Sequence, residues 1–415
     1  MKKIIVFFIL FLCTNTLYAG QKGIDFDWDK NEIFAQDEII VKFKKGISEN
    51  IKKAIHSRMG ALSYYDSYRK AFQIVKVKEG KVKKKVEAYS RLPQVEYAEP
   101  NYIYRACFTP NDEYYSYQWN FNQINMEEAW DYSKGTGVIV AIVDTGVDPN
   151  GVDSFGSRIL RGKSFIPLSF NSKDFESHGT HVAGTVAQET NNKEGVCGVA
   201  FEAYILPVKV LNRFGSGLDS WISNGIRWAA DNGADVINLS LGGQYGGFTL
   251  KLAVDYAFSK GVTIVAAAGN ENLDTINYPA AYENVIAVGA VNYDKKRAPY
   301  SNYGMKLDLV APGGNLSEDL NHDGLDDGIL QETFEKRLFG WKRWDYELFQ
   351  GTSMATPHVS GVVALIKAIH PDYTPSEIKQ VLISTAEDLG QSGWDTEYGY
   401  GLLNAASAVK YKLSH

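Results

Sequence analysis

The sequence has few cysteines, few prolines and no long apolar run beyond its first residues. Three cysteines in 415 residues, Cys13, Cys107 and Cys197, exclude a disulfide-rich scaffold, and none has the close spacing of a zinc site. Twelve prolines without a repeat period exclude a collagen-like chain. Beyond the N-terminus no stretch approaches the roughly 18 apolar residues of a membrane-spanning helix. We therefore expect a globular protein of two or three units without a membrane span, in which Cys197 is a packed thiol unless it pairs with Cys107.

The N-terminus has the layout of a secretory signal peptide. Two lysines precede an apolar run from Ile4 to Leu12, and Ala19 supplies a small residue at a cleavage point before Gly20. A buried N-terminal strand is the alternative interpretation. We predict a signal peptide over residues 1–19 and a secreted product, either extracellular or held in the periplasm or cell envelope.

Charge is distributed unevenly along the chain. Residues 38–105 carry 16 lysines and arginines against 7 acidic residues, whereas residues 106–415 carry 23 against 37. The overall net charge of −6 therefore conceals a basic segment and an acidic one. Opposite charge suggests that the two parts bind each other. The basic segment has no nucleic-acid motif and no clear basic stripe, so we predict no nucleic-acid partner.

The basic segment has the pattern of a small α+β unit over residues 38–106, preceded by a polar linker over 20–37. Ser48 is a plausible N-cap for the first of its helices. Alternating apolar residues predict the strands, and Pro100 is expected to close the last of them. The predicted strands are 38–43, 71–77 and 94–99, and the predicted helices are 48–59 and 81–91.

The sequence pattern changes near residue 110, where short and almost wholly apolar strands begin to alternate with helical stretches. Strands that are apolar on both faces and separated by helices predict a mostly parallel sheet covered on both sides. We therefore predict one three-layer α/β domain over 110–412. The predicted strands are 138–143, 203–210, 236–241, 263–268 and 285–288; the predicted helices are 181–189, 220–232, 249–260, 352–370 and 374–384.

Three polar motifs stand at the ends of these elements. Asp144, in the sequence DTG, follows a strand directly, and functional groups gather at the carboxyl ends of parallel strands. His178, in HGTHVAG, and Ser353, in GTSMATPH, stand near the starts of helices. Each motif alone is weak evidence, since Ser353 could be an ordinary N-cap. An aspartic protease would need a second DTG, and HGTH lacks the spacing and the Glu of a zinc motif.

Together the three side chains supply an orienting carboxylate, a general base and a nucleophile. Their order along the chain, Asp144 then His178 then Ser353, is the order found in subtilisin. Asn270 follows another strand, and its amide could join the Ser353 backbone N–H in binding an oxyanion.

These motifs, with YQW, GSG, SLGG and YSNYG in the same order, make the chain resemble the subtilase family over nearly all of residues 110–412. The match is greatest with the subtilisin and thermitase branches. The resemblance implies a monomeric serine endopeptidase that hydrolyses polypeptides with broad preference through an acyl-enzyme intermediate. A catalytically dead subtilase that only binds peptide would have lost one of the four residues, and all four are present. A processing protease and a scavenging one are not distinguished.

The resemblance also implies where substrate lies. GSG and SLGG resemble the two edges that pair with an extended peptide, and SLGG also resembles one wall of the primary pocket. The sequence AAG before Asn270 resembles the other wall, with Glu271 at the rim to disfavour acidic side chains. The residues implied are Gly215, Ser216, Gly217, Ser240, Leu241, Gly242, Gly243, Ala267, Gly269 and Glu271.

The basic unit resembles the inhibitor-type prodomain of subtilases, which is ferredoxin-like. Its end, Val95 to Tyr102, is close to the usual ending of that group. The resemblance implies that this prodomain acts as an intramolecular inhibitor. It also implies a self-cleaving zymogen, cut between about Asn101 and Pro110.

Two groups of oxygen ligands predict structural calcium (Ca²⁺). One loop alternates such ligands around a central Gly, like the start of an EF-hand, although Leu330 replaces its last Glu. A solvated acidic loop is the alternative. The resemblance to thermitase-like enzymes implies the second site, in which Glu194 is unusually acidic. The loop residues are Asp319, Asn321, Asp323, Leu325 and Asp327; the second set is Asp112, Asp153, Asn192 and Glu194, with the backbone near Glu189 and Val196.

The segment 316–350 departs from the compact family pattern. It adds the acidic loop and an aromatic-rich stretch just before the nucleophile motif. Either it shapes the leaving-group side of the cleft, or it is a solvent-exposed hairpin or helix.

Overall fold

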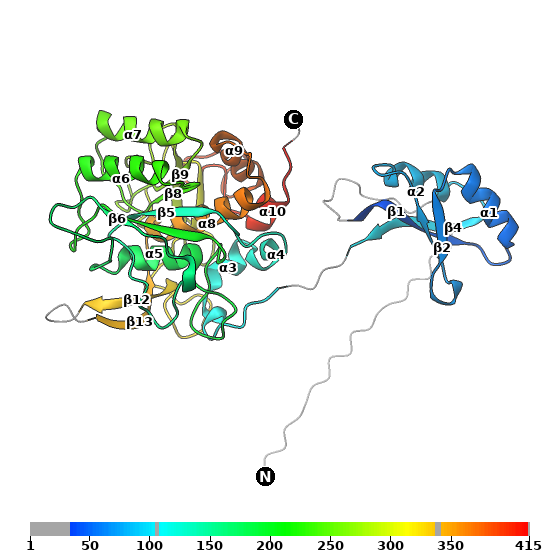
Figure 1. Ribbon diagram of the computed structural model, residues 1–415, viewed down its shortest axis with the longest axis horizontal. Helices are drawn as coiled ribbons and strands as arrows, with labels where there is room; N and C mark the ends of the chain where they lie inside the picture. Colours follow the sequence, from blue (N-terminus) through cyan, green and yellow to red (C-terminus); the bar gives the residue numbers. More distant parts are fainter. Residues whose placement is uncertain (1–33, 104–107, 337–341, 414–415) are drawn as a thin grey trace, which may run out of the picture. The chain divides into compact units, whose positions relative to one another are not determined.

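A computed structural model describes residues 34–103, 108–336 and 342–413. The chain divides into two compact units, Met1–Ala106 and Cys107–His415 (Figure 1). The predicted signal peptide and Cys107 lie outside the described residues. No helix in the described ranges is both long and apolar enough to cross a membrane.

The first unit is an antiparallel sheet with two helices. The strand order is β2-β3-β1-β4. Its strands are β1 (Phe34–Phe43), β2 (Ser63–Asp66), β3 (Gln73–Lys76) and β4 (Val95–Tyr102), and its helices are α1 (Glu49–Arg58) and α2 (Val82–Ser90). Alternate strand residues such as Ile39, Val41 and Val75 are buried together with Val86 and Tyr89 of α2. This is the small α+β fold that the sequence predicts.

Two sequence predictions for this unit are wrong in detail. The linker over 20–37 ends too late, because β1 already begins at Phe34. Pro100 does not close the last strand, because β4 continues to Tyr102 with Pro100 paired opposite Ile39. Proline lacks an N–H group and is tolerated where a strand lies at the edge of its sheet, as β4 does.

The second unit is built on a parallel sheet of seven strands in the order β11-β10-β9-β8-β5-β7-β6. Every residue of β9, and all of β5 except Ile139, is buried, which is why these strands are apolar except for Thr263 and Asp144 at their ends. The bounds are β5 (Ile139–Asp144), β6 (Lys163–Ser164), β7 (Tyr204–Lys209), β8 (Val236–Leu239), β9 (Thr263–Ala267), β10 (Ile286–Val291) and β11 (Leu309–Pro312).

Helices cover both faces of this sheet. The pair α6 and α7 lies over one face, and α5 lies on the other, where it contacts α8 (Figure 1). The longer helices are α5 (His178–Ala187), α6 (Asp219–Asp231), α7 (Phe248–Ser259), α8 (Thr352–Ile369) and α9 (Pro375–Thr385). The short helices α3 (Trp119–Gln123), α4 (Met126–Trp130) and α10 (Ala405–Lys410) were not predicted, since five or six residues carry too little periodicity.

The segment 316–350 contains a β-hairpin of β12 (Ile329–Lys336) and β13 (Lys342–Phe349). A solvent-exposed hairpin was one of the predicted alternatives. The hairpin is present, but half of it is not exposed to solvent. Residues Ile329–Phe334 are buried, and β12 contacts α5. The first six residues of β12 therefore lie in the protein interior beside the helix that begins at His178, whereas β13 is mostly half-buried.

Candidate active site

Asp144 is held at the end of β5 in the centre of the sheet. Its carbonyl oxygen accepts hydrogen bonds from Val210 N at 2.9 Å and Leu211 N at 3.1 Å. The side chain is fully buried; its Oδ1 accepts from Thr145 N at 2.6 Å and contacts His178 Nδ1 at 2.8 Å. No partner for Oδ2 lies among the described residues. A buried carboxylate is costly unless a charged or hydrogen-bonding group faces it, and here the imidazole does.

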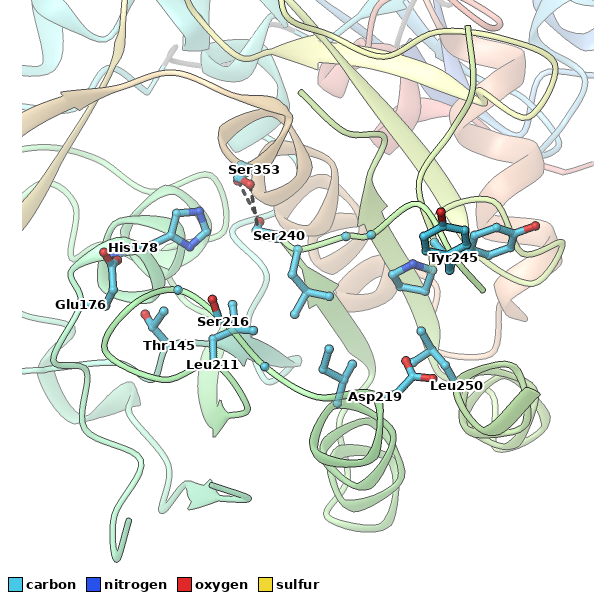
Figure 2. Close-up of a pocket in the computed structure, with 18 residues that line it drawn as sticks. Thr145, Glu176, His178, Leu211, Ser216, Asp219, Ser240, Tyr245, Leu250 and Ser353 are labelled. Carbon is cyan, nitrogen blue, oxygen red and sulfur yellow. Dashed lines mark hydrogen bonds between the residues drawn. The ribbon is translucent and has the colours of Figure 1, made fainter. Parts of the chain in front are cut away.

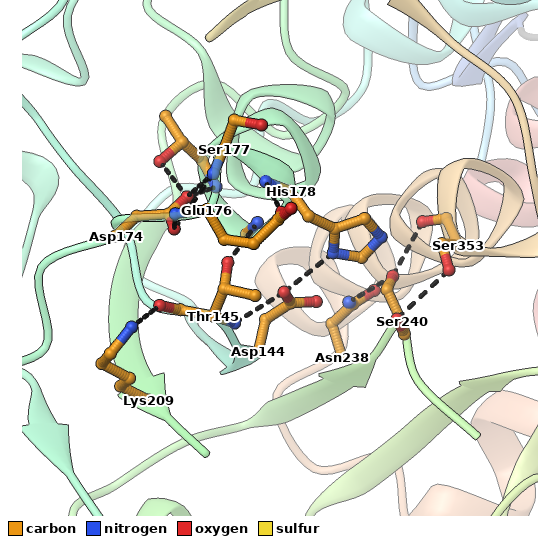
Figure 3. Close-up of polar contacts among 12 residues, drawn as sticks. Asp144, Thr145, Asp174, Glu176, Ser177, His178, Lys209, Asn238, Ser240 and Ser353 are labelled. Atoms are coloured by element: carbon orange, nitrogen blue, oxygen red, sulfur yellow. Dashed lines mark hydrogen bonds and ion pairs between the residues drawn. The ribbon is translucent and has the colours of Figure 1, made fainter. Parts of the chain in front are cut away.

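His178 is the first residue of α5 and lies between Asp144 and Ser353 (Figure 3). Burial lowers its pKa. The charge and hydrogen bond of Asp144, with the charges of Glu176 and Asp174, outweigh burial and raise the pKa of His178 to about 9. The side chain keeps 25% of its surface exposed. The imidazole can therefore be reached from the cavity while its surroundings stabilise the protonated form.

Ser353 lies in the first turn of α8, beside the end of β8. Its Oγ donates to the Ser240 carbonyl oxygen at 3.2 Å, and Ser240 Oγ donates to the Ser353 carbonyl oxygen at 2.8 Å (Figure 3). No hydrogen bond joins Ser353 and His178 in the described part of the chain. Rotation about one side-chain bond would turn Oγ toward the imidazole, and such bonds are often loose before substrate binds.

Asn270 is fixed by the residue before Ser353. Its Oδ1 accepts from Thr352 N at 2.8 Å and from Thr352 Oγ1 at 2.9 Å. Because both donors hold the oxygen, the nitrogen of the amide points away from Thr352. Gly269, at φ 116°, donates its N–H to the same Thr352 hydroxyl at 3.3 Å. The amide thus sits beside the N-terminus of α8 as a ready hydrogen-bond donor.

A cavity of about 570 Å³ opens in front of these residues (Figure 2). His178 and Ser353 line it together with seven residues predicted to bind substrate, and it also includes Thr145, Glu176 and Asp219. The seven are Gly215, Ser216, Gly217, Ser240, Leu241, Gly242 and Gly243. The structure therefore brings both predicted substrate edges to one cavity with Ser353 and His178.

The other three predicted substrate residues are not part of the lining. Ala267 is buried in β9, and the Glu271 carboxylate accepts from Asn270 N at 3.1 Å, Asn277 Nδ2 at 3.1 Å and Asn302 Nδ2 at 2.7 Å. Those three hydrogen bonds fix the Glu271 carboxylate next to Gly269. Its carboxylate supports the backbone at Asn270, a contact that the sequence prediction of a pocket rim missed.

The remaining histidine of HGTH is structural. His181 Nε2 lies 2.9 Å from the Ile329 carbonyl oxygen, and its ring stacks on Phe349 with 4.3 Å between centroids. Burial lowers the pKa of His181 to about 3, so it is neutral. No group of three or more His, Cys, Asp or Glu side chains in the described ranges is arranged to hold a metal ion.

Five of the six residues of the thermitase-like calcium set lie in segments that are far apart in sequence but joined by hydrogen bonds. Asp112 accepts from Asn191 N at 2.8 Å, while Asp153 accepts from Asn192 Nδ2 at 3.0 Å and Val196 N at 2.8 Å. Both aspartates are buried, and burial with the charge of Asp112 raises the pKa of Asp153 to about 7. Glu194 N contacts Asn192 Oδ1 at 2.8 Å. These two buried carboxylates accept from amide N–H groups and from the Cys197 thiol and form no ion pair among the described residues, so their charge fits an oxygen-ligand cation.

Two further glutamates belong to that region. The resemblance implied a backbone ligand near Glu189, and the Glu189 side chain lies against Gly156. Glu332 of β12, which was not predicted, accepts from Val152 N at 2.6 Å and Asp153 N at 3.2 Å. Burial raises the pKa of Glu332 to about 7, to which the charges of Asp153 and Glu194 add. No sequence signal marks Glu332, because it is 179 residues from Asp153.

The acidic loop joins β11 to the hairpin. Asp327 is fully buried; its Oδ2 accepts from Leu320 N at 2.7 Å, and its Oδ1 lacks a partner in the described structure. Asp319 Oδ1 is also buried and also lacks a partner in the described structure. Asp323 instead accepts from Leu325 N at 2.9 Å and from Asn321 Nδ2 at 2.8 Å. Asp319 and Asp327 therefore fit a cation, and Asp323 is turned onto its own loop.

The parallel sheet, the Asp144–His178 pair and Ser353 at an elongated cavity define a serine protease with an α/β fold. Residues 135–401 match the Subtilase family, and residues 26–101 match the Fervidolysin N-terminal prodomain. The chain belongs to the subtilase family, and it is a serine protease with an N-terminal prodomain.

Known proteases are similar to most of this chain. The thermophilic serine proteinase of Bacillus sp. (strain AK1) is 40% identical over 380 residues, 91% of this chain and 88% of the relative. Thermitase of Thermoactinomyces vulgaris is 39% identical over 305 residues, 73% of this chain and all of the relative. A solved protease structure from Pseudoalteromonas arctica aligns with a TM-score of 0.66 and 38% identity, covering 73% of this chain and 99% of the other.

Proposed function

We propose that this protein is a secreted endopeptidase, made as a self-cleaving zymogen, with Asp144, His178 and Ser353 as its catalytic triad. The observation that carries the proposal is the 2.8 Å contact between His178 Nδ1 and buried Asp144, with Ser353 lining the same cavity as His178. A dedicated processing protease and a scavenging one would differ in a peptide-library cleavage profile, where one narrow motif would indicate processing.

The chemistry follows from this geometry. Ser353 Oγ attacks the peptide carbonyl carbon while His178 Nε2 takes its proton, and Asp144 stabilises the resulting imidazolium. His178 then gives that proton to the leaving amine as the peptide bond breaks, which leaves an acyl-enzyme. Water, deprotonated by His178, hydrolyses the ester and restores Ser353. The GSG and SLGG edges hold the substrate as an added strand.

Removing the Asn270 amide should slow turnover without weakening substrate binding. In Asn270→Ala we expect kcat to fall about 100- to 1000-fold with KM nearly unchanged, because the amide contacts oxygen most strongly in the transition state; this magnitude is the one known from the relative subtilisin. Steady-state kinetics on a peptide substrate measure it. Asn272→Ala, on the exposed loop two residues on, is the matched control. An unchanged kcat in Asn270→Ala would remove this residue from the oxyanion hole.

Activity should rise with pH as His178 loses its proton, because only the neutral imidazole accepts the serine proton. Its raised pKa places the inflection of kcat/KM above the ordinary histidine value of 6.5. Glu176 favours the imidazolium, so Glu176→Gln should move the inflection to lower pH. Glu283→Gln, an exposed acid at a separate cavity, should leave it in place. The assignment fails if the inflection lies below 6.5 or ignores Glu176→Gln.

The first unit is proposed as the intramolecular inhibitor of this site. Three features support the proposal: the match of residues 26–101 to a protease prodomain, the excess of basic residues over 38–105 and the acidic charge of the remainder. Its separation from the second unit at Ala106 falls within the predicted cleavage range. The N-terminal sequence and mass of the exported product would locate both the signal-peptide cut and the maturation cut.

Calcium is proposed as a structural cofactor held by the Asp112–Asp153 cluster and by the acidic loop. Its chemistry when bound would be to neutralise buried carboxylates that otherwise repel one another. The triad requires no metal. The support is the buried aspartates and the oxygen-only donor sets described above.

Chelation should therefore destabilise the fold but not stop turnover directly. We expect a lower melting temperature and faster self-digestion in excess EDTA than in millimolar calcium, since a ligand bound only by the native state stabilises it. Asp319→Ala should lose one calcium equivalent, because Asp319 Oδ1 is a buried oxygen without a partner in the described structure. Asp326→Ala, in the same loop but outside the predicted ligands, should not. Calorimetry and metal analysis measure both. Identical unfolding in calcium and EDTA would refute the calcium proposal, and unchanged stoichiometry in Asp319→Ala would refute its acidic-loop half.

A further inference from the structure

The turn before His178 has a backbone conformation that needs support. Ser177 lies at φ 99°, a region that residues other than glycine rarely adopt. The Asp174 carboxylate accepts from Glu176 N at 2.8 Å and Thr180 N at 3.0 Å, and it also accepts from Ser177 N (Figure 3). His178 therefore begins α5 from a turn whose shape depends on the contacts around it.

The β12–β13 hairpin supplies contacts to this turn from a distant part of the sequence. Thr333, fully buried, donates its hydroxyl to the Ser177 carbonyl oxygen at 2.7 Å. Lys336 Nζ lies 2.9 Å from Glu176 Oε1. Lys342 Nζ donates to the Asp174 carbonyl oxygen and to the carboxylate of Asp148. Three hairpin side chains thus contact three of the four residues that precede His178.

The charges of the hairpin match those of the turn. Lys336 and Lys342 stand directly opposite each other in the hairpin register, an arrangement that destabilises an isolated strand pair. Each has its own acidic partner outside the hairpin: Glu176 for Lys336, and buried Asp148 for Lys342. The ring of Phe334 lies 3.7 Å from Lys342 Nζ and encloses it on the hairpin side. Docking of the hairpin on the 174–178 segment and on Asp148 therefore gives each of these lysines an acidic partner.

We propose that this hairpin positions the catalytic histidine, with Thr333 and Lys342 as positioning residues that hold the 174–177 turn. Held in this way, the imidazole keeps Nδ1 on Asp144 and presents Nε2 toward Ser353. The hairpin acts through the backbone of the turn and not on the substrate. The inference rests on the proposed role of His178, and it gives the 316–350 segment a function at the site.

Thr333→Val tests the inference with a side chain of the same shape that lacks the donor. Displacement of a reacting group by about 1 Å can cost up to about 100-fold, so we expect kcat to fall about 10- to 100-fold with KM within about twofold. Thr333→Ser, which restores the hydroxyl, should recover most of the loss. Measurements use the matured product of the full-length chain, with its active-site concentration titrated.

Lys342→Met is the second variant, because it removes the charge and keeps the aliphatic length over Phe334. It should lower kcat in the same way. Arg343→Met is the matched control: Arg343 is the next residue along β13, and its ion pairs in the described structure are with Asp345 and Glu335 of the hairpin itself. It should keep the wild-type kcat. If Lys342→Met does not fold, the Thr333 pair still decides the question.

A spectroscopic readout separates positioning from a general loss of stability. The far-downfield proton resonance of the His178–Asp144 hydrogen bond should shift or broaden in Thr333→Val and remain unchanged in Arg343→Met. A wild-type kcat and resonance in Thr333→Val, with only a lowered melting temperature, would overturn the inference. Substantial hydrolysis by His178→Ala would instead overturn the proposed function itself, so the two failures are distinguishable.

Discussion

Ser353→Ala is expected to abolish peptide hydrolysis and to leave the chain as an uncleaved precursor. Loss of the nucleophile in an enzyme of this kind lowers kcat about a million-fold, and self-cleavage would use the same hydroxyl. Mass spectrometry of the purified chain should then show the prodomain still attached, while hydrolysis of a peptide substrate is at background.

Two outcomes would contradict this expectation. One is maturation of the purified Ser353→Ala chain without any other protease present. The other is labelling of a different residue of the wild-type protein by a serine-directed phosphonylating reagent. Ser360→Ala is a useful control, since Ser360 lies on the same helix and donates to Asn238 at 2.8 Å, away from the cavity.

Asp144→Asn is expected to lower kcat about 10,000-fold while the protein still folds. The asparagine has the same shape and can still accept from Thr145 N, but it no longer carries the charge that stabilises the imidazolium. Because the Asp144 charge raises the pKa of His178, its loss should also move the remaining pH inflection to lower values. A kcat–pH profile measures both effects.

The matched control for that variant is Asp148→Asn, a buried acid that contacts the hairpin rather than the imidazole. If the positioning inference holds, it should reduce kcat far less than Asp144→Asn. Equal activity of Asp144→Asn and wild type would show that Asp144 does not serve His178.

The sequence predicted the central strands well because full burial makes nearly every residue of such a strand apolar. The residues before Asp144 are apolar at each position, and β10 is apolar along its whole length. The strand β6 was not predicted, because its two residues are too few to form an apolar run. Family motifs then located Asp144, His178 and Ser353, and the structure places the first two in direct contact and the third beside them.

What the sequence could not predict are contacts between segments far apart in it. Gln331, Glu332 and Thr333 form a polar run that favours an exposed strand, yet all three are buried. Each satisfies a distant backbone group: Gln331 donates to the Cys197 carbonyl oxygen, Glu332 accepts from Val152 N, and Thr333 donates to the Ser177 carbonyl oxygen. The contacts of Glu271 are also distant in sequence. Nothing near Glu271 in the sequence indicates that its carboxylate accepts a hydrogen bond from the Asn302 amide, so the sequence prediction gave it only a place at the pocket rim.

The docking of the hairpin on α5 also has a consequence for the order of events in synthesis and folding. The bond from Thr333 to Ser177 spans 156 residues, and the bond from Ser240 to Ser353 spans 113. Contacts of such separation close large loops and make folding slow, as do parallel sheets in general. Almost the whole chain must leave the ribosome before Ser353 can lie beside His178. The proposed peptidase activity can therefore arise only late in folding, after these distant segments have come together.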